Sequence, residues 1–153
     1  MPATTTANDL RTQMNVRSVD FDPNVDTAAF VTLNPAGSAA GLALGNFRKF
    51  MAVYFTSVGT GGITAFSIGG ATAADGTGYV AAVSHAVGSN PNAVGDYLVI
   101  ECTDEQIREV LSTATHVCVS VDIVTATDEG VVTFIQADPL YGPTAGLTAD
   151  YVS

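Results

Sequence analysis

The chain has very little positive charge and no tryptophan. Its 153 residues contain four arginines and one lysine against fifteen carboxylates, which gives a formal net charge of −10. This charge opposes binding to nucleic-acid phosphates and to anionic membranes. Its longest apolar windows are also far shorter than the roughly 20 residues that span a bilayer. We therefore expect neither nucleic acid nor a membrane as a partner.

Cysteine and histidine are scarce, with two of each. Cys102 and Cys118 fall in predicted strands and nothing marks an oxidising compartment, so we expect two buried free thiols rather than a disulfide. Residues 1–15 are polar and lack a basic stretch followed by an apolar one, so we expect no secretory signal. A chain of this length buries enough surface to fold without a disulfide or a metal, and we expect no cofactor.

Charged residues make up only 13% of the chain, against roughly 25% in ordinary soluble domains. Glycine, alanine, threonine and valine are abundant instead. This composition suits a chain that covers much of itself against other subunits, although a stable isolated β-domain has a similar bias.

Predicted strands follow one another at roughly ten-residue spacing from residue 47 to residue 137, with glycine-rich loops between them. Between Val117 and Ile123 every odd residue is valine or isoleucine, so one face is apolar and the other is expected to meet water. The expected core comprises Val117, Val119, Val121, Ile123, Phe134, Leu98 and Ile100. The pattern predicts an all-β fold, an antiparallel β-sandwich of the jelly-roll-like kind.

Two hairpins are expected from adjacent strand patterns. One joins residues 47–56 to residues 63–68 across a glycine loop, and the other joins residues 115–124 to residues 131–136 across a turn. Residues 50–55 are apolar at both parities, which predicts a strand covered on both faces.

One short helix is expected after Cys102. Thr103 can cap it, and Gln106 completes a capping box. The apolar side chains of Ile107, Val110 and Leu111 are predicted to share the face that packs on the sandwich.

The two ends of the chain hold little regular pattern. We predict an extended N-terminal arm over residues 1–46, a sandwich over residues 47–137 and a C-terminal arm over residues 138–153, with a disordered N-terminal tail as the alternative for the first. Scattered apolar side chains in these arms are the candidate interaction residues: Val16, Val19, Phe21, Phe30, Leu33, Leu140, Tyr141, Leu147 and Tyr151.

No catalytic or metal-binding pattern stands out. The glycine loops at residues 59–62 and 69–78 lack the spacing, the following helix and the lysine of phosphate-binding loops. His116 and Cys118 lie two apart on a strand, too far for an ion pair without rotation. Asp104, Glu105 and Glu109 cluster around the predicted helix, where acidic side chains have an ordinary structural role at its N-terminal end. With no catalytic pattern left, we expect no enzyme activity.

The chain resembles the capsid decoration, or cement, proteins and related head-stabilising proteins of tailed bacteriophages. The likeness is carried by residues 50–59, 63–77, 94–102, 131–136 and 146–150. It implies a β-sandwich that binds the outside of the major capsid protein lattice, often as a trimer, and clamps the expanded head after assembly in the bacterial host cytoplasm. Another virion component, such as a head spike base or tail protein, is the main alternative, and a small carbohydrate-binding or hydrolytic domain is a further one.

Overall fold

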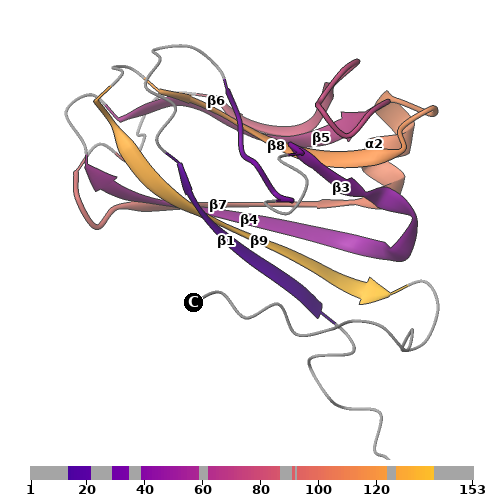
Figure 1. Ribbon diagram of the computed structural model, residues 1–153, viewed down its shortest axis with the longest axis horizontal. Helices are drawn as coiled ribbons and strands as arrows, with labels where there is room; N and C mark the ends of the chain where they lie inside the picture. Colours follow the sequence, from indigo (N-terminus) through magenta and orange to yellow (C-terminus); the bar gives the residue numbers. More distant parts are fainter. Residues whose placement is uncertain are drawn as a thin grey trace, which may run out of the picture.

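The computed structural model describes residues 14–21, 29–34, 39–58, 62–86, 91, 93–123 and 127–139. These residues form two antiparallel sheets packed face to face, with a short α-helix at one end (Figure 1). The predicted all-β sandwich is therefore confirmed. In chain order the elements are β1 (Met14–Phe21), β2 (Ala29–Phe30), β3 (Gly41–Ala43), the 3-10 helix η2 (Leu44–Asn46), β4 (Phe47–Val58), β5 (Ile63–Ala71), β6 (Val80–Ala86), β7 (Tyr97–Thr103), α2 (Asp104–Val110), β8 (His116–Ile123) and β9 (Glu129–Pro139).

The order of the strands is that of a jelly roll. One sheet has the order β1-β9-β4-β7, and the other has the order β2-β8-β5-β6 with β3 also paired to β8. β2 and β3 pair with successive stretches of β8, and the amide of Val31 donates to the carbonyl of Val119 between them, so they act as one interrupted edge strand. Counted in this way, the described residues form eight strands in two sheets of four, and most connections cross from one sheet to the other.

These crossings make both expected hairpins wrong. β4 pairs with β7 and β9, whereas β5 pairs with β6 and β8. β8 and β9 likewise lie in different sheets. A glycine-rich segment can form a tight turn within one sheet or a crossing between two sheets. The crossing is favoured here because the apolar inner faces of the two sheets must cover each other.

The sandwich begins well before the predicted boundary at residue 46. β1 pairs along its whole length with β9, from Met14 with Ala137 to Phe21 with Gly130. Val31, Leu33 and Leu44 are buried in the core. This part of the predicted arm is thus an integral edge of the fold, whereas residues 1–13 and 140–153 lie outside the described residues.

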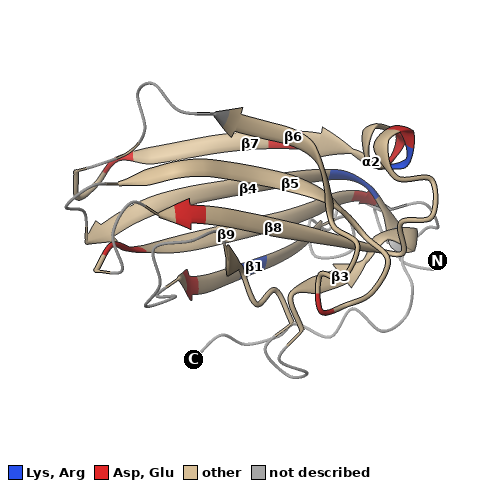
Figure 2. Ribbon diagram, turned by 90° about the horizontal axis from the view of Figure 1, so that it is seen from above, with Lys and Arg blue, Asp and Glu red and all other residues tan. Residues whose placement is uncertain are grey.

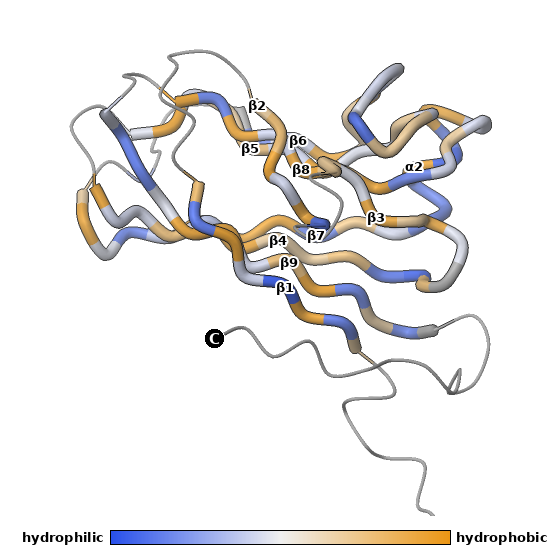
Figure 3. The backbone as a smooth tube through the Cα atoms, viewed as in Figure 1, coloured by the Kyte–Doolittle hydropathy of each residue, from blue (hydrophilic) through white to orange (hydrophobic). Residues whose placement is uncertain are grey.

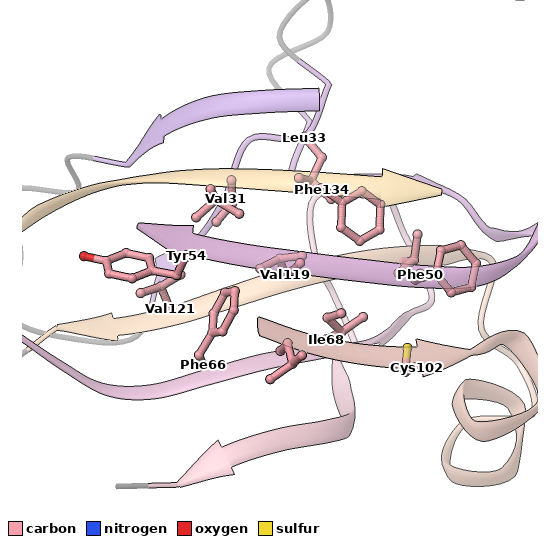
Figure 4. Packing of buried hydrophobic residues seen from close by; sticks show 14 of the residues in the cluster. Val31, Leu33, Phe50, Tyr54, Phe66, Ile68, Cys102, Val119, Val121 and Phe134 are labelled. Atoms are coloured by element: carbon pink, nitrogen blue, oxygen red, sulfur yellow. The ribbon is translucent and has the colours of Figure 1, made fainter. Parts of the chain in front are cut away.

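The core lies between the two sheets and contains most of the expected residues (Figure 4). Val117, Val119, Val121, Ile123, Phe134 and Ile100 are buried, and Leu98 is half-buried against them. Across the interface the rings of Tyr54 on β4 and Phe66 on β5 pack edge to face with centroids 6.0 Å apart. This pair joins the two sheets directly.

The helix α2 has the predicted capping box. The Gln106 amide donates to the Thr103 hydroxyl, and the Thr103 amide donates to the Gln106 side chain. Ile107 is fully buried and Leu111 is partly buried, but Val110 is exposed, so its expected place on the packing face is wrong. Over the described residues, no helix has the length and apolar content needed to cross a membrane.

Candidate interaction surface

The described candidate interaction residues do not gather on one surface. Phe21 and Leu33 are buried in this chain's own core, and Val19 packs against it. Val16 is 50% exposed on β1, whereas Phe30 is 36% exposed on β2 of the other sheet. Leu140, Tyr141, Leu147 and Tyr151 lie outside the described residues.

A different surface stands out, the outer face of the β1-β9-β4-β7 sheet, which we call the open face. Inward residues such as Ala52, Tyr54 and Phe134 are buried, so their neighbours in sequence point outward. The pairing places sixteen outward residues in four rows. Row 1 is Met14, Ala137, Lys49 and Thr103; row 2 is Val16, Ile135, Met51 and Glu101; row 3 is Ser18, Thr133, Val53 and Val99; row 4 is Asp20, Val131, Phe55 and Tyr97.

The open face is apolar in the middle and charged only at its margin. Ten of the sixteen positions are apolar or aromatic, three are serine or threonine and three are charged. Asp20 and Glu101 lie on the two edge strands and Lys49 lies in the end row, while the hydroxyls of Ser18 and Thr133 bond each other at 3.0 Å. Figure 3 shows hydrophobic residues recurring along β1, β9 and β4, and Figure 2 shows charge mainly near strand ends and on α2.

One end of the open face is hollowed into a pocket of about 480 Å³. All of row 1 lines it, together with three residues of row 2 and Gln106 of α2. Its apolar walls come from methionine, isoleucine and alanine side chains, with Lys49 and Glu101 as the charged groups. Apolar walls beside a few polar groups are typical of a pocket that receives a hydrophobic side chain or ligand.

The opposite end of the open face carries two aromatic side chains. Phe55 and Tyr97 are direct cross-strand partners in row 4, and they are 44% and 69% exposed. Aromatic side chains this exposed have a large apolar area available for a partner. We call this pair the aromatic ridge.

Part of the outer face of the other sheet is covered by this chain itself. The Tyr79 hydroxyl bonds that of Ser67 at 2.8 Å, and the rings of Phe30 and Tyr79 pack edge to face with centroids 5.1 Å apart. A Cβ atom on Gly76, which has a φ of +89°, would lie 2.5 Å from the Phe30 ring. Residues 72–79 thus cover β5 and β8, and Cys118 on the face expected to meet water is fully buried.

The buried titratable side chains have structural roles. Both cysteines are free, as predicted, and burial raises the pKa of each thiol to about 12. Burial and the nearby Asp128 carboxylate raise the pKa of Tyr54 to about 12. His116 bonds the Thr115 hydroxyl at 2.9 Å through Nδ1. Within the described part of the chain, no cluster of three or more histidine, cysteine or acidic side chains is placed to hold a metal.

Sequence reasoning missed the open face although β4 signalled it. Its odd residues Met51, Val53 and Phe55 are apolar, and the pattern predicted coverage on both faces. In the structure the even residues are buried, whereas Phe55 is 44% exposed and Met51 and Val53 are only partly buried. A sandwich strand that is apolar at both parities therefore indicates an outer face suited to a partner.

Comparison with known proteins gives distant likenesses only. No protein-family model matches the chain, and no curated protein matches its sequence. Among solved structures, the tobacco streak virus coat protein is 9% identical with a TM-score of 0.35, and the match covers 92% of this chain and 99% of that one. A structure of the infectious bursal disease virus Gx strain is 17% identical with a TM-score of 0.33, over 87% of this chain.

This chain spans about a third of the length of the bursal disease virus chain, since the match covers 32% of it. The fold class rests on the strand order described above. The resemblance to tailed-bacteriophage decoration proteins stays a prediction.

Proposed function

We propose that the protein is a structural component of a virus particle and binds a neighbouring protein through its open face. The observation that carries this proposal is the apolar centre and charged margin of that face. Protein interfaces have this arrangement, with few charges at the core and a polar rim. The largest apolar patch on a protein surface is often a site of interaction.

The jelly-roll fold agrees with this role without requiring it, since viral capsid domains, lectins and cupins share that architecture. The net charge of −10 supports the proposal, because it keeps the protein from packaged nucleic acid. We propose that the protein has no catalytic activity and needs no cofactor.

In its finer form the proposal is a capsid decoration, or cement, protein of a tailed-bacteriophage head. It would bind the major capsid protein on the outside of the lattice and stabilise the expanded head, with assembly in the bacterial host cytoplasm. The sequence resemblance supports this form and implies a trimer. A head spike base or a tail protein is the alternative, because both would use the same fold and face.

The test compares two valines that lie on edge strands and have similar exposure. Val99 lies in the open face and is 42% exposed, whereas Val80 lies on β6 of the other sheet and is 38% exposed. Particles are purified from cells that produce the protein, and their protein content is measured by mass spectrometry. Cosedimentation of added protein with particles stripped of it then measures binding.

We expect mass spectrometry to find the protein in the purified particles. The Val80→Asp variant should bind stripped particles as tightly as the wild-type chain. Val99→Asp should bind at least about tenfold more weakly, because it buries an unpaired carboxylate at the interface. Absence of the protein from purified particles would overturn the proposed function. Equal binding by the two variants would show that the open face is not the contact.

Carbohydrate binding is the second candidate, and the aromatic ridge is the observation that favours it. Exposed Phe55 and Tyr97 side by side offer a flat apolar surface to a sugar ring. A glycan-array screen tests it: specific binding that Tyr97→Ala abolishes would favour this candidate over the structural one.

A further inference from the structure

The aromatic ridge and the pocket lie at opposite ends of the same strands. Row 4 holds Phe55 on β4 and Tyr97 on β7, and row 1 holds Lys49 on β4 and Thr103 on β7 at the pocket. Six residues separate Phe55 from Lys49, which is roughly 20 Å along a strand. One surface therefore carries both a projection and a hollow at a fixed separation.

We propose that two copies of this chain associate face to face about a twofold axis, so that the aromatic ridge of each copy enters the pocket of the other. This inference rests on the coarser form of the proposed function, a virion component that binds a neighbouring protein through its open face. It names a second copy as that neighbour, in place of the major capsid protein of the finer form. With the axis in the plane of contact and perpendicular to the strands, each strand lies over its own counterpart running the opposite way. Row 4 of one copy then lies over row 1 of the other, and the contact occurs twice.

The size and shape of the open face suit this arrangement. Sixteen positions, at strand spacings of about 4.8 Å and repeats of about 6.7 Å along each strand, give about 500 Å² of flat area before side-chain relief is counted. Stable interfaces bury about 800 Å² per partner, so the flat area supplies most of that, and the relief of the exposed Phe55 and Tyr97 side chains adds to it. Two sheets pack well when their strands stay within about 30° of alignment.

The charges of the open face also fit a second copy. Each chain has a net charge of −10, so two copies repel each other, and they repel least when the faces that meet carry little charge. The open face carries one cation and two carboxylates, all at its margin. In the twofold arrangement Lys49 of one copy faces the aromatic ridge of the other, a contact that an ammonium group and an aromatic ring favour. The Lys49 ammonium lies 4.0 Å from the Asp138 carboxylate of its own copy, both exposed, so this surface ion pair is weak enough to yield to the new contact.

Sedimentation equilibrium of the purified full chain tests the proposal. The wild-type chain should form dimers. The double variant Phe55→Ala/Tyr97→Ala removes the ridge, and Ala137→Phe fills the pocket from row 1. Each should raise the dimer dissociation constant by about thirtyfold or more, as loss of an aromatic anchor from its pocket does. Val80→Asp is the control and should leave the constant unchanged.

Mixing the two variants tests the twofold geometry itself. A mixed pair has one intact ridge opposite one open pocket, and the filled pocket faces the space that the missing ridge has left. Equimolar mixing should therefore restore dimers that neither variant forms alone. Far-UV circular dichroism and the melting temperature of each variant confirm that the fold is retained.

The outcomes separate this inference from the proposed function. A monomeric or trimeric wild-type chain, or a mixture that stays monomeric, would overturn the twofold pairing. If that chain still bound particles through Val99, the proposed function would stand with another partner on the open face. If it formed dimers but was absent from particles, the pairing would stand and the proposed function would fall.

Discussion

Replacing Phe66 with alanine tests whether the contact between the two sheets holds the fold together. Phe66 on β5 is fully buried, and its ring packs edge to face on Tyr54 of the opposite sheet at 6.0 Å. Truncating a buried phenylalanine costs about 3–5 kcal/mol through lost burial and the cavity left behind. Because domains are stable by about 5–15 kcal/mol, Phe66→Ala should remove a large fraction of the total.

Phe55→Ala is the matched control, since Phe55 is the same residue type and 44% exposed on the open face. Its cost should be about 1 kcal/mol or less. Urea unfolding followed by far-UV circular dichroism measures both. With an m value of about 2 kcal/mol/M, Phe66→Ala should lower the midpoint by about 1.5–2.5 M at unchanged slope. Each is measured at two protein concentrations, because dimer formation makes the midpoint concentration-dependent.

A double-mutant cycle with Tyr54→Leu and Phe66→Leu isolates the ring contact, and we expect a coupling of about 0.5–1.5 kcal/mol. If Phe66→Ala and Phe55→Ala shifted the midpoint equally, or the coupling were zero, packing of β4 on β5 would not be what stabilises the sandwich.

Two further predictions concern buried thiols and the helix cap. Burial raises the pKa of Cys102 and Cys118 from 9.0 to about 12, so their contribution to stability should be complete below pH 9 and lost as pH rises to 12. Urea unfolding midpoints across that pH range measure this loss. The midpoint of Cys118→Ala should fall less over the same range. Iodoacetamide should label neither thiol before unfolding, and labelling of the native chain would contradict their burial. Thr103→Ala removes the hydroxyl that accepts the Gln106 amide and should cost about 1 kcal/mol, lowering the melting temperature by about 2–4 °C. An unchanged melting temperature would mean that the cap is not needed.

The local elements were predictable where a pattern repeats over a few residues. The alternation from Val117 to Ile123 identified β8 and its buried side, because side chains in a strand alternate between the two faces. Thr103 and Gln106 identified the start of α2, because a capping box satisfies backbone amides within one turn. The exposure of Val110 was missed, since a helix of seven residues covers the sheet with only part of one face.

Partners between strands were not predictable from neighbouring residues. The segment between β4 and β5 was expected to form a hairpin, yet those strands belong to opposite sheets. Met14–Phe21 was expected to be an arm, yet it pairs with β9, which lies more than a hundred residues later. Such pairings depend on which apolar faces cover each other, a property of the whole chain.

The amino-acid sequence by itself determined that this protein is an acidic, all-β chain with free thiols and a capped helix after Cys102, because charge, strand period and capping act within a few residues. Only the tertiary structure decided which apolar faces the chain covers. Residues 72–79 cover the part of the β5 and β8 face around Ser67 and Cys118. Cys118 is buried there, as expected for a structural thiol, although the alternation of β8 alone predicted that its face meets water. The open face has no comparable cover among the described residues, so apolar residues such as Val99 and Phe55 stay partly exposed. The two faces differ because covering a sheet depends on contacts between segments far apart in the sequence, which no local pattern contains.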